Sequence, residues 1–211
     1  MSGEYFCERC VKVQPVSKET DYFTCLGLPR RLTIDQNKLE SKFYEMSRAF
    51  HPDFYQNKSE TEQTISLGNA ATLNTAYRTL RDPIQRAEYL LDLEAGSVKD
   101  IRTSPPADLF EKILGLQDTL EAYRSSDRTS QEGQELRTQL LAEHGALEQR
   151  KRDMEQQLQR LFTDWDVLQD RGEASSQARA ERDHLLKQMR EILSNRTYVK
   201  NIVNDLVETI G

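Results

Sequence analysis

Three consecutive residues, His51, Pro52 and Asp53, have the side chains best suited to act on another molecule. A proline fixes its own backbone angle and disfavours helical geometry in the residue before it, so the helical pattern leading to Phe50 must stop here. The imidazole and the carboxylate then stand in a loop, where their own helix does not satisfy their hydrogen-bonding groups. The tripeptide therefore predicts an outward-facing loop that presents one imidazole and one carboxylate.

A second candidate site is the pair Cys7 and Cys10, whose two-residue separation is typical of zinc knuckles, in which a tight turn brings two thiolates together. Structural zinc needs four ligands, and the one further cysteine, Cys25, falls at an apolar position of a helical pattern. We therefore expect no resident cofactor. Zinc at Cys7 and Cys10, completed across a dimer, stays open as an alternative.

No enzymatic active site stands out elsewhere in the sequence. There is no Ser/His/Asp arrangement, glycine-rich phosphate loop or paired-carboxylate site, and His144 and His184 lie in charged helical sequence. The formal charge of −6 argues against bulk nucleic-acid binding, because neutralising phosphates requires a local surplus of Lys and Arg. We expect a protein that is not an enzyme and binds no nucleic acid.

The composition predicts an all-α protein. Only nine glycines and six prolines interrupt 211 residues, 30% of the residues are charged, and the mean hydropathy is −0.76. Amphipathic helices have this composition because one face of each helix is solvated. No apolar run approaches the roughly 18 residues of a membrane span, and the N-terminus lacks a secretory apolar segment. The chain has three cysteines, a small and odd number that does not fit a disulfide scaffold. We therefore expect a cytoplasmic location.

Four helices are predicted between residues 21 and 94, and two of them flank the His51–Asp53 loop. The first, around 22–26, ends at Gly27, and the second is capped by Thr33 or Asp35. The third begins near residues 59–61, and Asp82 caps a fourth with Pro83 at its first position. Apolar residues at helical spacing form the expected core, which includes Leu39, Phe43, Met46, Phe50, Leu73, Ala76, Tyr77, Leu80, Ala87 and Leu91.

Heptad spacing predicts three further helices after the linker, joined by breaks at 125–130 and at Gly172. The middle helix carries apolar residues every seven positions, and Arg196 interrupts the same pattern in the last helix. These patterns predict an antiparallel three-helix bundle, with a long coiled-coil dimer as the alternative. The apolar positions are Leu109, Ile113, Leu116, Leu120 and Tyr123, then Leu140, Leu147, Met154, Leu161 and Leu168, then Leu185, Ile192, Val199 and Leu206.

The chain is accordingly predicted to have four parts. Residues 1–20, which lack helical periodicity, form an N-terminal tail with the cysteine pair, and residues 21–94 form the first helical domain. Residues 95–106 contain the Gly, Ser and Pro cluster of a linker. Residues 107–211 form the bundle.

Residues 21–93 resemble a J-domain, and among J-domains they are most similar to the HscB family of iron–sulfur co-chaperones. The helix around residues 21–29 and the Phe50–Asp53 segment resemble the family's opening helix and loop. The run 82–91, DPIQRAEYLL, resembles the segment that distinguishes HscB from other J-proteins. A looser resemblance to the family's closing helices follows around residues 161–165 and 193–199.

This resemblance implies a co-chaperone. The J-domain would dock on a DnaK/HscA-type ATPase chaperone and stimulate ATP hydrolysis through His51, Pro52 and Asp53 by matching position. The bundle would carry the scaffold protein IscU, which holds the nascent Fe–S cluster, to that chaperone. Positive charge for docking would come from the second helix, at Lys38, Lys42 and Arg48.

The sequence departs from the family at this docking surface. Between residues 37 and 50 three basic residues face two acidic ones, Glu40 and Glu45, which leaves a net charge of only +1. Phe54 follows Asp53 where the family usually has Lys or Arg. We therefore expect weaker electrostatic steering, or a less acidic partner.

For client binding, the family uses an exposed apolar strip with nearby acids on the first bundle helix. Here Phe110 and Leu114 lie four apart beside the buried stripe, and such an extra apolar patch is a candidate interface. We predict that Phe110 and Leu114, with Glu111 and Asp118 as polar companions, bind the scaffold. Delivery of a different client, or a zinc or redox role of the cysteine pair, are the alternatives.

Overall fold

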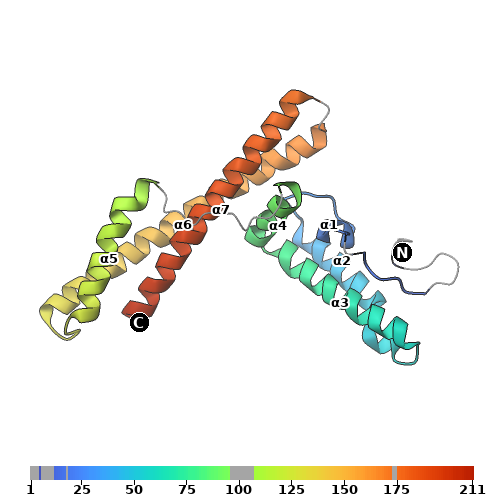
Figure 1. The fold of residues 1–211 in the computed structure, drawn as a ribbon, viewed down its shortest axis with the longest axis horizontal. Coiled ribbons are helices and arrows are strands. Elements are labelled where there is room, and N and C mark those ends of the chain that lie inside the picture. The colour runs from blue at the N-terminus through green and yellow to red at the C-terminus, as the bar shows by residue number, and fades with distance from the viewer. Residues whose placement is uncertain (1–4, 6–11, 18, 96–106, 173–174) are drawn as a thin grey trace. The chain divides into compact units, whose positions relative to one another are not determined.

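The computed structural model describes residues 5, 12–17, 19–95, 107–172 and 175–211. These residues form α-helices and short 3-10 turns with no β-strand among them, which confirms the predicted all-α fold (Figure 1). They divide into two compact units, Met1–Gly96 with Trp165–Arg171, and Ser97–Asp164 with Gly172–Gly211. Within the described ranges, no helix is both long and apolar enough to cross a membrane.

The first unit is built on an antiparallel pair of helices, α2 (Gln36–Ala49) and α3 (Glu60–Arg81), as Figure 1 shows. Two shorter helices, α1 (Tyr22–Cys25) and α4 (Pro83–Ala95), pack on α3. All four agree with the predicted helices, because local caps determine where they begin. Asp35 caps α2, Ser59 forms a capping box with Glu62, and Asp82 accepts hydrogen bonds from the first backbone N–H groups of α4.

The core of this unit follows the predicted apolar stripes with three corrections. Met46, which was expected in the core, is half-buried. Leu39, Phe50 and Cys25 are fully buried, and burial raises the pKa of the Cys25 thiol to about 11. Phe43 and Tyr77, which were expected in the core, are only half-buried. Their rings stack with centroids 4.2 Å apart, so they cover the side of the α2–α3 pair rather than fill its centre.

The predicted N-terminal tail also contributes to this unit. Tyr5 and Val13 are buried, and the Tyr5 hydroxyl donates to the backbone carbonyls of Cys25 (3.1 Å) and Thr24 (3.3 Å). The buried Asn69 side chain on α3 donates to the Gln14 carbonyl and accepts from the Val16 N–H, both at 2.8 Å. The packed unit therefore extends beyond the predicted boundary at residue 21.

The same unit includes the C-terminal end of α6 (Gln131–Arg171), another difference from the predicted boundaries. The buried carboxylate of Asp166 accepts hydrogen bonds from the backbone N–H groups of Leu32 and Thr33, both at 2.8 Å. These two bonds satisfy donors in the loop between α1 and α2, which has no helical partner for them.

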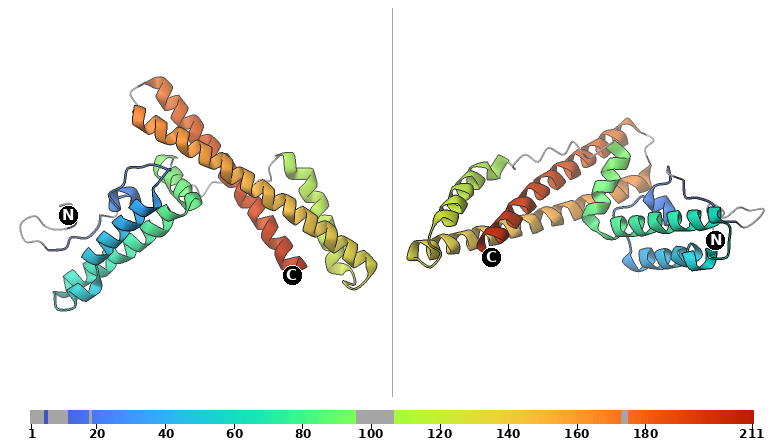
Figure 2. Two further views of the ribbon diagram at one scale, coloured as in Figure 1. Left: turned by 180° about the vertical axis from the view of Figure 1, so that it is seen from behind. Right: turned by 60° about the horizontal axis from the view of Figure 1, so that its bottom comes forward.

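The second unit contains α5 (Phe110–Ser125), α6 up to Asp164, and α7 (Ser176–Ile210), with a short 3-10 turn, η3 (Ala107–Leu109), before α5. Figure 2 shows α6 and α7 running side by side in opposite directions. Predicted apolar positions of all three helices meet in a core that includes Leu120 of α5, Leu147 and Met154 of α6, and Val203 and Leu206 of α7. The predicted polar gap, Arg196, is paired with Glu155 across the two helices at 2.7 Å, which satisfies its charge.

We expect Tyr5→Phe to lower the free energy of unfolding of the first unit by about 1–2 kcal/mol, because the substitution removes a buried donor from two backbone carbonyls. Unfolding in urea can be followed by the fluorescence of Trp165, the single tryptophan, which belongs to this unit. Tyr44→Phe is the matched control, since that exposed hydroxyl reaches only the side chain of Glu40. Equal effects of the two changes would contradict the packing of Tyr5.

Candidate functional site

The His51–Asp53 loop lies at the turn between α2 and α3. Phe50 ends α2, His51 has an extended backbone (φ −62°, ψ 124°), and Pro52 begins a 3-10 turn, η1 (Pro52–Tyr55). Pro52 therefore ends the helix as predicted, and the extended geometry at His51 is the one that a following proline favours.

Buried hydrogen bonds fix the backbone on both sides of this loop. The Ser66 hydroxyl on α3 donates to the Phe50 carbonyl at 2.8 Å, and the Tyr55 hydroxyl donates to the Ala49 carbonyl at 2.9 Å. The Phe54 N–H closes the 3-10 turn on the His51 carbonyl at 3.0 Å. Since Phe50 and Ser66 are fully buried, the turn is anchored to the core and its conformation is fixed before any partner binds.

The two polar side chains of the loop point outward, with exposed fractions of 53% for His51 and 70% for Asp53. The Asp53 N–H donates to Nδ1 of His51 at 3.3 Å, so the neutral imidazole carries its proton on Nε2. The Gln56 amide donates to Oδ1 of Asp53 at 3.2 Å. The loop thus presents one N–H donor and one carboxylate acceptor in a defined orientation.

The predicted docking residues lie on α2, and one of them is already paired. Lys38 and Arg48 are exposed, whereas Nζ of Lys42 forms an ion pair with Glu45 at 2.9 Å. The hydrogen bond and the charge of Lys42 lower the pKa of Glu45. Lys42 therefore adds little unbalanced positive charge to this surface.

Sequence reasoning missed the residues that hold the loop, namely Ser66, Tyr55 and Gln56. The sequence does contain a signal for Ser66, because this polar residue falls on the apolar stripe of α3 that continues through Leu73, Ala76 and Leu80. A polar residue on a buried stripe must have a hydrogen-bond partner, but the sequence could not identify the Phe50 carbonyl as that partner.

The second candidate surface lies on α5, where four side chains on one face are buried: Ile113, Leu116, Leu120 and Tyr123. Phe110 and Leu114 lie off this face and are 57% and 55% exposed. Glu111 and Asp118, their predicted polar companions, are exposed as well. The structure therefore places all four predicted scaffold-binding residues at the surface of α5.

Ion pairs hold α5 against its two neighbours within the second unit. Asp108, in η3 just before α5, pairs with Arg150 of α6 at 2.6 Å, and Lys112 of α5 pairs with Glu143 of α6 at 2.8 Å. At the other end of α5, Arg124 pairs with Asp205 of α7 at 2.8 Å. These contacts orient the helix so that Phe110 and Leu114 stay outside the core.

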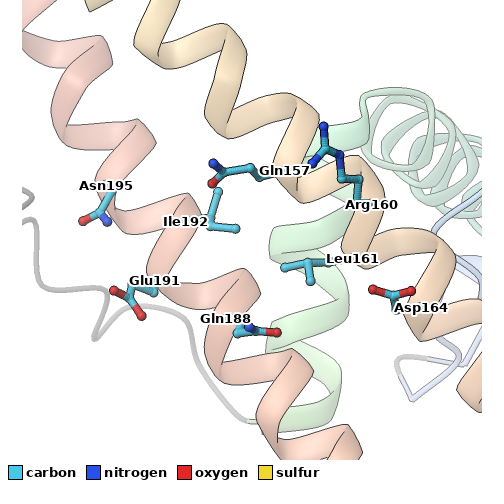
Figure 3. A pocket seen from close by; sticks show the side chains of 8 residues that line it. All are labelled: Gln157, Arg160, Leu161, Asp164, Gln188, Glu191, Ile192 and Asn195. Atoms are coloured by element: carbon cyan, nitrogen blue, oxygen red, sulfur yellow. The ribbon is translucent and has the colours of Figure 1, made fainter.

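The structure differs from the predicted apolar contact between α6 and α7 at one place, where a groove lies between the two helices. Leu161 and Ile192, expected in the core, are half-buried and line an open hollow of about 490 Å³ (Figure 3). Polar side chains surround them: Gln157, Arg160, Asp164, Gln188, Glu191 and Asn195. In this part of α6, Leu158 and Phe162 are buried, whereas Leu161 is only partly covered.

The predicted zinc pair, Cys7 and Cys10, lies outside the described residues. Among the residues that are described, no three His, Cys, Asp or Glu side chains come together in a way that could hold a metal ion.

Comparison with known proteins identifies the first unit. Residues 21–89 match the family model of the DnaJ domain. The chain is 49% identical over 74 residues to the co-chaperone protein HscB of Proteus mirabilis. This aligned segment covers 35% of this chain and 43% of that protein. It is 37% identical over 91 residues to the iron–sulfur cluster co-chaperone protein HscB of Mus musculus, covering 43% of this chain and 39% of that protein.

Two solved structures extend the likeness. Chaperone HscB from Vibrio cholerae has a TM-score of 0.59 and 26% identity, over 89% of this chain and 96% of that one. Residues 21–89 therefore form a DnaJ domain, and the chain is similar to HscB co-chaperones. The crystal structure of human co-chaperone protein HscB, with a TM-score of 0.64 and 20% identity over 99% of this chain and 91% of that one, supports the fold alone. In sequence, the match spans only about two fifths of the length of the curated HscB relatives.

We expect Ser66→Ala to lower the free energy of unfolding by about 1–3 kcal/mol, because the buried Phe50 carbonyl loses a hydrogen bond. Urea unfolding followed by Trp165 fluorescence measures the change. Thr64→Ala is the control, since it removes a hydroxyl that donates to the Glu60 carbonyl on the exposed face of the same helix. A loss no larger than that of the control would show that Ser66 does not anchor the loop.

Proposed function

We propose that this chain is a co-chaperone that stimulates the ATPase of a DnaK/HscA-type chaperone and delivers an Fe–S scaffold protein of the IscU type to it. The observation that carries this proposal is the anchored, outward-facing loop of His51, Pro52 and Asp53 in a DnaJ domain. The names of the HscB relatives, a co-chaperone and an iron–sulfur cluster co-chaperone, support the same cellular role.

The loop would act by binding, without bond chemistry of its own. The Nε2–H of His51 can donate a hydrogen bond and the Asp53 carboxylate can accept one, and both groups are held by backbone that is fixed in advance. Such an interface loses little conformational entropy on binding. The exposed Lys38 and Arg48 would meet carboxylates of the chaperone beside the loop.

The α5 surface would bind the scaffold protein. Two exposed apolar side chains one helical turn apart, with Glu111 and Asp118 nearby, have the composition of a small protein interface. Their exposure supports this role because burying Phe110 or Leu114 on a partner would cost the fold nothing.

We expect His51→Gln to abolish stimulation of the chaperone's ATPase, because the flexible amide does not hold an acceptor and a donor in the positions of Nδ1 and Nε2 of the imidazole. The measurement is the steady-state ATP turnover of a purified DnaK-type or HscA-type chaperone, with and without the chain and an IscU-type scaffold. Helical content and melting temperature should not change, since the side chain is exposed.

The matched control is His184→Gln, which changes an exposed histidine on α7. Full stimulation by the His51 variant, or equal losses with both variants, would rule out the proposed role of the loop.

We expect the double change Phe110→Ala and Leu114→Ala to weaken scaffold binding by about 10-fold to 100-fold, the effect typical of apolar anchors, while barely changing the melting temperature. Isothermal titration with an IscU-type scaffold measures the affinity. Val207→Ala, another exposed apolar change in the second unit, is the control. If the double change unfolds the chain, the two side chains are structural, and if wild-type binds only other clients, the alternative adaptor role holds.

A further inference from the structure

The chain segment that carries the His51–Asp53 loop has no net formal charge. From residue 36 to residue 56 the basic residues Lys38, Lys42 and Arg48 are balanced by Glu40, Glu45 and Asp53. The ion pair between Lys42 and Glu45 also neutralises one cation locally. Attraction between exposed charges falls off within a Debye length of about 10 Å, so a balanced surface contributes little long-range steering.

The same loop carries a large apolar side chain at its outer surface. Phe54 is 67% exposed, the highest value among the exposed large apolar residues of the described chain. It points outward because the next residue, Tyr55, turns inward and is buried with its hydroxyl on the Ala49 carbonyl. Single exposed apolar residues are common, but this one lies beside the His51–Asp53 loop and is therefore a candidate contact for a partner that covers the loop.

Phe54 is also held in place. Its N–H donates to the His51 carbonyl at 3.0 Å, and its ring lies edge-on to the imidazole, with 6.1 Å between centroids. The ring and the imidazole are both exposed and adjacent on the same loop, so a partner that covers His51 can also contact Phe54. A fixed aromatic side chain is an efficient interface anchor because little rotational freedom is lost when it is buried.

We propose that Phe54 is a specificity-determining contact, which inserts into an apolar recess on the ATPase chaperone next to the site that receives His51 and Asp53. This inference rests on the proposed function and adds the chemistry of the partner's surface. At this point the chaperone would present apolar side chains in place of carboxylates, and short-range contact would replace charge attraction as the main source of affinity.

The test compares wild-type chain with Phe54→Ala and Phe54→Lys, by titrating each into the chaperone that wild-type stimulates most and measuring ATP turnover. For Phe54→Ala we expect the concentration for half-maximal stimulation to rise about tenfold, equivalent to about 1.4 kcal/mol, with the maximal rate unchanged. For Phe54→Lys the concentration for half-maximal stimulation should rise at least as much, because a charged ammonium cannot enter an apolar recess without losing hydration. Leu67→Ala, an exposed apolar change on α3, is the control and should match wild-type.

Salt separates the apolar contact from an ionic one. The ratio of the half-maximal concentrations of Phe54→Ala and wild-type should change less than about twofold between about 50 and about 300 mM KCl, because screening acts on the charges that both proteins share and spares apolar contact. The proposal is overturned if Phe54→Ala equals wild-type, or if Phe54→Lys stimulates better at low salt, which would show an acidic surface at this point. Absence of stimulation by wild-type with either chaperone type would instead reject the proposed function itself, and the inference with it.

Discussion

The His51–Asp53 loop depends on one buried contact, the hydrogen bond from the Ser66 hydroxyl to the Phe50 carbonyl. Phe50 is the last residue before the loop, and its side chain lies in the core between α2 and α3. Because Pro52 prevents the helix from continuing, the Phe50 carbonyl needs a partner from outside α2. Ser66 supplies it, and the loop is thereby tied to the most buried part of α3.

In several other places in the first unit, a buried polar side chain also hydrogen-bonds to backbone that lies outside regular secondary structure. Asn69 binds the backbone on both sides of residue 15, Tyr5 donates to two carbonyls at the end of α1, and Asp166 accepts from Leu32 and Thr33. Each is a buried polar side chain that pairs with irregular backbone, which would otherwise be costly to bury. The unit can therefore keep an exposed, polar loop without loosening its core.

In the second unit, two apolar residues of α5 stay exposed outside the core. Its helices are long and charged, and heptad spacing places most apolar residues between them. Ion pairs at both ends of α5 orient the helix. One face of α5 is therefore buried, and Phe110 and Leu114, which lie off that face, remain exposed. An exposed apolar pair on a helix that is fixed by charge is suited to reversible binding, because the fold does not depend on it.

The sequence by itself determined the helices, their caps and the outward loop, because these features follow from neighbouring residues: Asp35, Ser59 and Asp82 act on the next turn of chain, and Pro52 acts on His51. It also identified Phe110 and Leu114 as apolar residues beside a buried stripe. Only the tertiary structure decided that Tyr5 and Asp166 pack into the first unit, that Phe43 and Tyr77 cover its side, and that Leu161 lines an open groove. Those outcomes depend on contacts between residues far apart in the chain, whose geometry no local spacing encodes.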